Sequence, residues 1–296
     1  MKKSKIWQAI FITPCLVTFI LVILVPFFLG VWYSLTDWNG ISTTQNFVGF
    51  ANYIEMFQSP EFLYSFLVTI IYTVINVLLV NLMGFSLALL VTSKIKTRNL
   101  CRAGFFVPNL IGGVVLGYIW QFVFNQFFPD FFETLGTNFM EQSMLSNANL
   151  VVFAMSIVFN WQYAGYIMII FVAAIQGVSG EVLEAAKVDG ASKLKITFKI
   201  LIPMIAHAFT ISMFLIIKNS FMLFDMNLVL TGGGPSIRFM GSVIKSSSLL
   251  PLTIYNKSIS SNQLAKGQAM SVVFFLVIAL ISLIQVTLNK RKEVEL

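Results

Sequence analysis

The segment EAAKVDGASKLKITFKILIP, Glu184 to Pro203, is a short charged stretch between two long apolar runs. After its first glutamate it carries five more charged residues, and Gly190 divides it. Ser179 just before it can cap a helix start, so residues 181–189 predict a short helix. Glycine adopts left-handed conformations readily and ends helices. A second, basic helix is expected from Ala191 to Ile200. Taken alone, the segment also fits an interfacial helix packed on lipid headgroups.

The runs around this segment decide the class of protein. The chain has 296 residues, of which 57% are hydrophobic and 10% charged, whereas a soluble domain averages about 25% charged. A bilayer core of about 30 Å needs about 20 helical residues, and barrel strands would be only about 10 residues long. The sequence therefore predicts an all-α integral membrane protein, one transmembrane domain over residues 1–296. Its six helices are expected at about 8–35, 62–92, 104–125, 150–176, 204–228 and 268–288.

The first apolar run, from Ile6 to Tyr33, is longer than the apolar region of about 7–15 residues in a cleaved signal peptide. We expect it to be retained as a helix. Between the helices, Asn39-Gly40 and the run Leu230–Pro235, which contains three glycines, predict tight turns.

The charge pattern predicts the orientation. Of the 19 Lys and Arg residues, 14 fall on one side if six helices alternate. By the positive-inside rule that side is cytoplasmic, so both termini and the loop 177–203 are expected there. This pattern also explains the net charge of +7 without a nucleic-acid partner. The 14 residues occupy positions 2, 3, 5, 94, 96, 98, 102, 187, 193, 195, 199, 290, 291 and 292.

Several kinds of site are not expected in this chain. His207 is the single histidine, so a multi-histidine metal site is excluded, and Cys15 and Cys101 lie in different surroundings. No phosphate-binding G-x-x-x-x-G-K-[ST] motif occurs, so any dependence on ATP has to come from a partner. A catalytic carboxylate pair or an activated nucleophile is not evident either, which argues against a membrane enzyme.

The charged segment resembles the EAA loop of ABC importer permeases: E-A-A, three residues, G, nine residues, I-x-L-P. The matching positions are Glu184-Ala185-Ala186, Gly190 and Ile200 to Pro203, with Ile202 where the family commonly has leucine. The resemblance covers nearly the whole chain and narrows to sugar-importer permeases related to the larger permease of the maltose transporter. It weakens from Ser236 to Gly267. Supporting segments are SLTDWNG at 34–40, FVGFANY at 47–53, CRAGFFVPNLIGGVVLGYIW at 101–120, EVLEAAKVDGAS at 181–192 and FDMNLVLTGGGP at 224–235.

The resemblance implies a type I importer permease fold in a bacterial cell membrane, in a chain that is a multi-pass transport subunit and not an enzyme. Implied partners are a second permease in a heterodimer, two copies of an ATPase and an extracellular sugar-binding protein. This chain would bind no cofactor, because ATP and magnesium belong to the ATPase. The EAA loop would seat in a groove of the ATPase, a helix-in-groove contact. The coupling residues so implied are Glu184, Ala185, Ala186, Asp189, Gly190 and Pro203.

The resemblance also implies a sugar site within the spans. Aromatic rings that stack on sugar faces, with amides and hydroxyls that bond to sugar hydroxyls, suit such a site. Simple helix–helix hydrogen bonding is the alternative role for these polar residues. Several side chains differ from those of the maltose permease, so which sugar is carried stays open. The matching positions are Asn109, Gly113, Phe159, Tyr163, Tyr166, Asn219, Ser220 and Leu223.

Two points remain open at the level of sequence. Lys218 lies within a span and has no clear family counterpart; it can reach toward the interface, pair with an acid on a partner, or meet an acidic sugar. The chain could also serve an ABC importer of a non-sugar solute. A self-sufficient secondary transporter is a weaker alternative, because every acid, which would be needed to couple an ion, falls outside the spans or, as Asp225 does, at a span edge.

Overall fold

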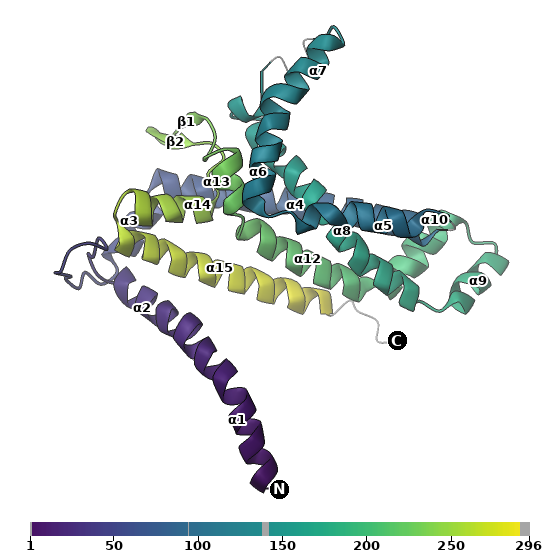
Figure 1. The fold of residues 1–296 in the computed structure, drawn as a ribbon, viewed down its shortest axis with the longest axis horizontal. Helices are drawn as coiled ribbons and strands as arrows, with labels where there is room; N and C mark the ends of the chain where they lie inside the picture. The colour runs from purple at the N-terminus through teal and green to yellow at the C-terminus, as the bar shows by residue number, and fades with distance from the viewer. Residues whose placement is uncertain (1, 94, 138–141, 291–296) are drawn as a thin grey trace. The chain divides into compact units, whose positions relative to one another are not determined.

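The computed structural model describes residues 2–93, 95–137 and 142–290, so Lys94 and the basic positions 291 and 292 lie outside it. The described chain is mostly helical (Figure 1). It packs as two compact units, each built from two stretches of sequence. Unit 1 is Met1–Leu63 with Thr253–Leu276, and unit 2 is Tyr64–Leu252 with Val277–Leu296.

Unit 1 combines an N-terminal helical rod with a group of short elements. The rod runs through α1 (Lys2–Phe19), the π-helical turn η1 (Ile20–Leu24) and α2 (Val25–Ser34). Gly30 lets α2 approach α15 (Leu264–Lys290), because a Cβ there would lie 2.8 Å from Oε1 of Gln268. The amide of Asn52, on α3 (Ala51–Gln58), donates to the carbonyls of Ser34 and Thr36. The π-helical turn η6 (Asn256–Ser260) completes the unit.

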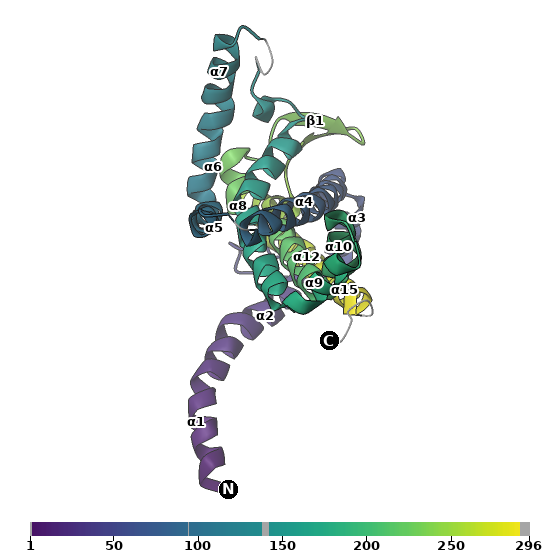
Figure 2. The ribbon, with the colours of Figure 1, turned by 90° about the vertical axis from the view of Figure 1, so that its right-hand side faces the viewer.

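Unit 2 is a helical bundle in which α4 (Pro60–Thr92), α8 (Val151–Gly177) and α12 (Ala206–Phe221) lie side by side (Figure 2). Half or more of α8 is buried, as expected of a central helix. The remaining elements of the unit are α5 (Arg98–Phe106), η2 (Val107–Leu110), α6 (Gly113–Phe122), η3 (Val123–Phe127), α7 (Phe128–Thr134), η4 (Met144–Ser146), α9 (Gly180–Val188), α10 (Lys193–Ile196), η5 (Thr197–Leu201), α11 (Ile202–Met204), α13 (Asp225–Leu230), β1 (Ser236–Phe239), β2 (Ser242–Lys245) and α14 (Leu250–Tyr255), which continues into unit 1.

Glycines set how closely the helices of unit 2 approach. A Cβ on Gly165 of α8 would lie 1.8 Å from the carbonyl oxygen of Phe105, so α5 crosses α8 in direct backbone contact. A Cβ on Gly84 of α4 would lie 2.8 Å from Cγ2 of Ile167 on α8. Within a membrane the hydrophobic effect does not drive helices together, so close packing matters more. Small residues at helix crossings allow the backbones to pack closely.

Within the described residues, four continuous helices are long and apolar enough to cross a membrane: Ile10–Ser34, Pro60–Thr92, Val151–Gly177 and Leu264–Leu288. Two further candidates are sharply bent pairs, Arg98–Leu110 with Gly113–Thr134 at 100° and Lys193–Met204 with Ala206–Phe221 at 72°. Counting each pair as one span gives six. The third expected helix, 104–125, is therefore divided at Ile111-Gly112. The fifth, 204–228, begins at the second bend, around Ile205, and is interrupted again after Phe221.

The glycine-rich run Leu230–Pro235 forms a tight turn, as its composition predicts. Gly232, Gly233 and Gly234 have φ of +55°, +93° and +77°. The antiparallel hairpin of β1 and β2 follows, with Ile237 opposite Ile244. The sequence did not predict these strands, because four residues are too few to show the alternation of apolar and polar residues by which a strand is recognised.

Candidate substrate and coupling sites

The EAA segment forms two short helices joined by a turn at Gly190. At the end of α9, the N–H of Ala191 donates to the carbonyl of Ala186 and that of Gly190 donates to Lys187, both at 3.0 Å. This pair of hydrogen bonds is the Schellman cap, which needs a residue in the left-handed conformation. Gly190 supplies that residue, with φ +76°. The sequence thus dictates the turn locally.

The caps differ from the expectation in one respect. Ser179 is the N-cap residue of α9, but its side chain makes no capping hydrogen bond. The capping hydroxyl lies instead at the second helix, where Ser192 accepts from the N–H of Lys195 at 3.3 Å. The helix starts are therefore stabilised unequally, and α10 carries the side-chain cap.

One face of α9 is fully open to solvent. Glu181, Glu184, Ala185 and Val188 are exposed at helical spacing, and Val188 exposes 87% of its surface. Asp189, Gly190 and Pro203 are exposed as well. A face that mixes carboxylates, a small side chain and an open valine suits a partner groove better than a lipid surface.

Of the two alanines of the EAA motif, only Ala185 lies on this face. Ala186 is buried within the chain, while Ala185 is exposed. Consecutive residues point about 100° apart on a helix, so only Ala185 can present its small side chain to a partner. Ala186 instead packs inside the loop, where α9 and α10 contact each other.

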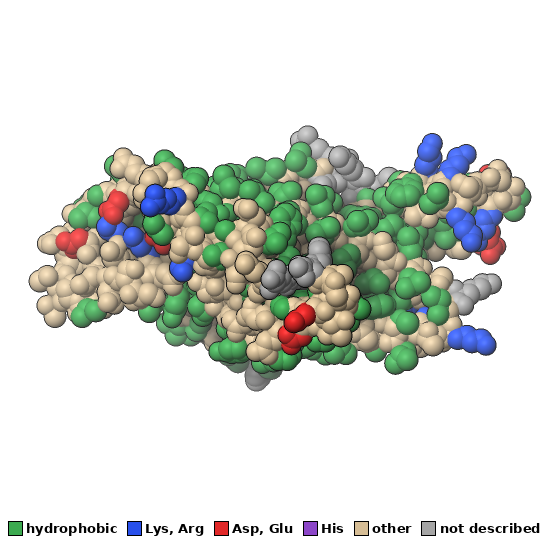
Figure 3. Space-filling model, turned by 90° about the horizontal axis from the view of Figure 1, so that it is seen from above, with side chains coloured by type: hydrophobic (Ala, Val, Ile, Leu, Met, Phe, Trp, Pro, Cys, Tyr) green, Lys and Arg blue, Asp and Glu red, His purple; other side chains and the backbone are tan. Residues whose placement is uncertain are grey.

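The loop lies at one end of unit 2 (Figure 1). The space-filling view shows Lys and Arg side chains at that end, and others on the opposite side of the same view, with hydrophobic side chains between them (Figure 3). Lys187, Lys193, Lys195 and Lys199 are all exposed there. The positive-inside rule predicts that this end faces the cytoplasm, and that orientation stays a prediction.

In the interior of unit 2, two helix breaks meet beside α8. The first break is Ile111-Gly112, before α6, and the second follows α12, before α13. A Cβ on Gly113 would lie 3.1 Å from Cβ of Asp225, so the two restarting helices are in contact. Gln162 of α8 holds the first break, because its Nε2 donates to the carbonyl of Ile111 at 3.1 Å. Broken helices of this kind form substrate sites in membrane transporters.

The expected aromatic residues lie on α8 next to these breaks. The rings of Phe159 and Tyr163 are 4.4 Å apart, and Phe159 also meets Tyr72 of α4 edge-on at 5.8 Å. Phe159 is completely buried, whereas Tyr163 and Tyr166 are half-buried. In this conformation Phe159 supports the ring of Tyr163, and the two tyrosines offer the accessible aromatic surface.

The other expected substrate residues flank the two breaks. Asn109 and Gly113 are half-buried on either side of the first. Asn219 is half-buried and Ser220 buried in the last turn of α12, and the Ser220 hydroxyl has no hydrogen-bond partner among the described residues. Leu223 lies within the second break and belongs to the same buried cluster as Phe159. The eight positions thus come from three segments that the fold brings to two neighbouring breaks.

Two polar features were not expected from the sequence. Asn160 Nδ2 donates to Oδ1 of Asn76 at 2.8 Å and to the carbonyl of Ser156 at 2.7 Å, which ties α4 to α8 at mid-span. Ser212 Oγ donates to Oδ1 of Asn81 at 2.5 Å, which ties α4 to α12. Isolated asparagines in an apolar run could have predicted these two contacts, because such residues mostly form hydrogen bonds between helices.

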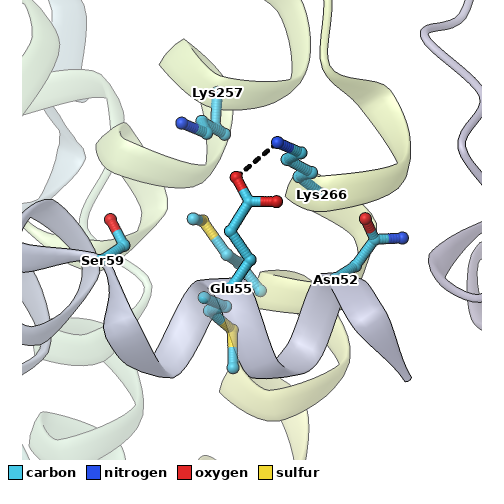
Figure 4. A pocket seen from close by; sticks show the side chains of 7 residues that line it. Asn52, Glu55, Ser59, Lys257 and Lys266 are labelled. Carbon is cyan, nitrogen blue, oxygen red and sulfur yellow. Dashed lines mark hydrogen bonds and ion pairs between the residues drawn. The ribbon is translucent and has the colours of Figure 1, made fainter.

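Hollows also lie away from the breaks, in both units. In unit 2, one of about 450 Å³ opens between α4, α6 and α8; its lining residues are apolar except for Ser156 and Asn160, and they include Trp120 and Trp161. In unit 1, a cavity of about 30 Å³ lies beside the ion pair of Glu55 and Lys266, with Lys257 also on its wall (Figure 4). That volume holds about one water molecule, so this cavity cannot admit a sugar.

Known proteins are similar to this chain in sequence and in fold. Residues 80–294 match the family described as binding-protein-dependent transport system inner membrane component. The chain is 40% identical to the probable starch degradation products transport system permease protein AmyD of Thermoanaerobacterium thermosulfurigenes, covering 99% of this chain and 97% of that one. It is 30% identical to the multiple sugar-binding transport system permease protein MsmF of Streptococcus mutans, covering 98% of each.

The fold matches a chain of a bacterial alginate ABC transporter solved in complex with an alginate pentasaccharide-bound periplasmic protein. The TM-score is 0.80 at 16% identity, over 98% of this chain and 96% of that one. The expected all-α permease fold is thereby confirmed, and the relatives are transport subunits rather than enzymes. The match covers more than half of the residues and includes the EAA segment. The chain therefore belongs to the family of binding-protein-dependent transport system inner membrane components.

Proposed function

We propose that this chain is the permease subunit of an ATP-driven importer of sugars or oligosaccharides, and that it forms half of the translocation pathway. The observation that carries the proposal is the pair of helix breaks that meet beside Gln162 of α8, in a chain whose relatives are named for starch degradation products and for multiple sugars. Malto-oligosaccharides are therefore the first substrates to test.

The proposed partners are the other components of a binding-protein-dependent transport system. A second permease would complete the pathway, an ATPase dimer would hydrolyse ATP, and an extracellular sugar-binding protein would deliver the substrate. ATP and magnesium would stay on the ATPase. The apolar rod Ile10–Ser34 supports an assembly in the membrane, because its most apolar part is unburied within the chain and needs lipid or a neighbouring helix to cover it.

Coupling would proceed through α9. Its exposed face of Glu181, Glu184, Ala185 and Val188 would enter a groove of the ATPase as a rigid helix. The Schellman cap at Gly190 fixes the angle between α9 and α10, and α10 continues through η5 and α11 to the bend before α12. Movement of the ATPase would therefore reach α12, and with it the second break, as a rigid-body displacement.

The test is uptake of radiolabelled maltotriose by the assembled importer in proteoliposomes. Gly190→Pro removes the left-handed turn, because proline fixes φ near −65°, and Glu184→Lys reverses the charge on the docking face. Both variants should insert and assemble with the second permease, yet lose ATP-driven uptake. Ser179→Ala is the matched control in the same loop: no capping bond is lost, so uptake should be unchanged. Normal uptake by both Gly190→Pro and Glu184→Lys would reject the coupling role.

A further inference from the structure

Lys218 is a cation on the bundle helix α12 of unit 2 that forms no ion pair within the described residues. It lies in the last turn of α12, and its side chain is exposed. Across the described ranges the only ion pair joins Glu55 and Lys266, so no acid there neutralises Lys218.

The contacts of α12 place Lys218 near the middle of the span. Ser212 contacts Asn81, whereas farther along the chain Asn227 bonds to Leu249, and the adjacent Leu250 N–H donates to Thr69. Residue numbers thus rise along α12 and α13 as they fall along α4, which makes the two directions antiparallel. Lys218 lies six residues after Ser212, which is about 9 Å along the helix axis. The same distance along α4 from Asn81 reaches about residue 75. That is midway along Pro60–Thr92.

This depth argues against lipid as the neighbour of Lys218. From mid-span, either surface is about 15 Å away, farther than a lysine side chain can reach by snorkelling. An ammonium group facing hydrocarbon at the helix centre costs about 2.5–3.5 kcal/mol on the insertion scale. Lys218 also shares one exposed stripe of α12 with Ile211 and Phe214, at helical spacing. At the depth of Lys218, that stripe therefore faces water or protein.

The backbone next to Lys218 leads to the same conclusion independently. α12 ends at Phe221, and three residues without helical structure precede α13. Non-helical backbone at membrane depth occurs only where it is buried in protein or lines a water-filled cavity. The neighbouring Ser220 hydroxyl, completely buried and without a hydrogen-bond partner among the described residues, adds an unsatisfied polar group to this end of the helix.

From these observations we infer that Lys218 lines the aqueous translocation pathway and donates hydrogen bonds to oxygen atoms of the transported sugar. Its ammonium offers three donors, at the level where the half-buried Asn219 offers an amide on the adjacent position. This inference rests on the proposed function and assigns Lys218 a role in substrate affinity.

Water accessibility tests the placement of Lys218 without any need for transport. In the assembled importer, with Cys15→Ala and Cys101→Ala as background, the Lys218→Cys thiol should react with a charged, membrane-impermeant thiol reagent. Maltotriose with the binding protein should slow that reaction. Two controls should stay unreactive: Ile216→Cys, completely buried on the same helix, and Leu82→Cys, 65% exposed on the apolar surface of α4. Labelling of Lys218→Cys no faster than that of Leu82→Cys overturns the inference.

Uptake kinetics test the contact with substrate. Lys218→Met keeps the length of the side chain and removes its donors, so the KM for maltotriose uptake should rise about tenfold, as expected for loss of a charged hydrogen bond. Lys218→Arg keeps charge and donors and should retain most of the affinity. A KM unchanged by Lys218→Met, or poor recovery of the assembled complex, overturns the inference; poor recovery would indicate a pair with an acid of the second permease.

Failure of the proposed function would look different. If the wild-type importer takes up no maltotriose or other sugar, the sugar assignment fails, while reaction of the Lys218→Cys thiol still reports whether this position faces water. Conversely, normal sugar uptake with an unreactive Lys218→Cys thiol retains the importer and rejects only the role of Lys218.

Discussion

At the scale of single residues, Asp37 shows how a short polar motif stabilises a loop. Its carboxylate accepts from the backbone N–H of Asn46 at 2.7 Å and from Nδ2 of the same residue at 2.9 Å. The backbone hydrogen bond, followed by the side-chain bond, lowers the pKa of Asp37 below its ordinary value of 3.8. The Asn39-Gly40 turn lies between the two partners, with Gly40 at φ +90°.

This pKa shift predicts a pH-dependent loop. Since the folded pKa is lowered, the stabilisation is present above the ordinary pKa of 3.8 and is lost as the pH falls through the folded value. We expect the Asn46 amide to be protected from hydrogen exchange at pH 6 and to lose protection on acidification below pH of about 4. Asp37→Asn, which cannot become a carboxylate, should abolish this pH dependence. Equal pH dependence in Asp37→Asn and the wild type would contradict the assignment.

At the scale of elements, close crossings of helices decide the architecture of unit 2. Gly165 allows α5 to contact the backbone of α8, and the resulting path of α5 leads into the first helix break. The break at Ile111-Gly112 is in turn held by Gln162, one helical turn before Gly165 on α8. One turn of α8 therefore positions both α5 and the start of α6.

This crossing predicts unequal effects of two glycine substitutions. Gly165→Ala would place a Cβ 1.8 Å from a backbone oxygen, so we expect a loss of about 3 kcal/mol or more. Gly104→Ala on the facing helix α5 meets nothing within 4 Å; there alanine should be neutral or stabilise by about 0.5–1 kcal/mol, through its helix propensity. Thermal unfolding in detergent measures both. A similar melting temperature for the two variants would show that α5 does not cross α8 at Gly165.

At the scale of the whole molecule, the distribution of charge orients the chain in the membrane. The exposed lysines of the EAA loop and the exposed hairpin of β1 and β2 mark opposite sides if six spans alternate. The orientation is still a prediction, and it matters because an EAA loop outside the cell could not meet an ATPase.

Two cysteine variants test that orientation in intact cells. Val188→Cys, at a position 87% exposed in the EAA loop, should react with an impermeant thiol reagent only after the cells are permeabilised. Met240→Cys, at a position 66% exposed in the hairpin turn, should react without permeabilisation. Cys15 and Cys101 are replaced in both backgrounds. Labelling of Val188→Cys in intact cells would overturn the topology and, with it, the coupling role of the loop.

The sequence by itself determined the membrane class and the turn at Gly190. Each of these depends on local properties: the length of an apolar run, and the left-handed conformation that glycine permits beside a helix end. The charge pattern likewise predicts an orientation without knowledge of any contact.

Only the tertiary structure decided where helices break and which polar groups meet there. The contact of Gly113 with Asp225, the support of Phe159 by Tyr72, and the burial of Ala186 but not Ala185 join residues whose partners are set by packing. The physical reason is that hydropathy and propensity are properties of neighbouring residues along the chain. A break in an apolar helix, by contrast, is stable only when other helices or water satisfy its freed backbone groups.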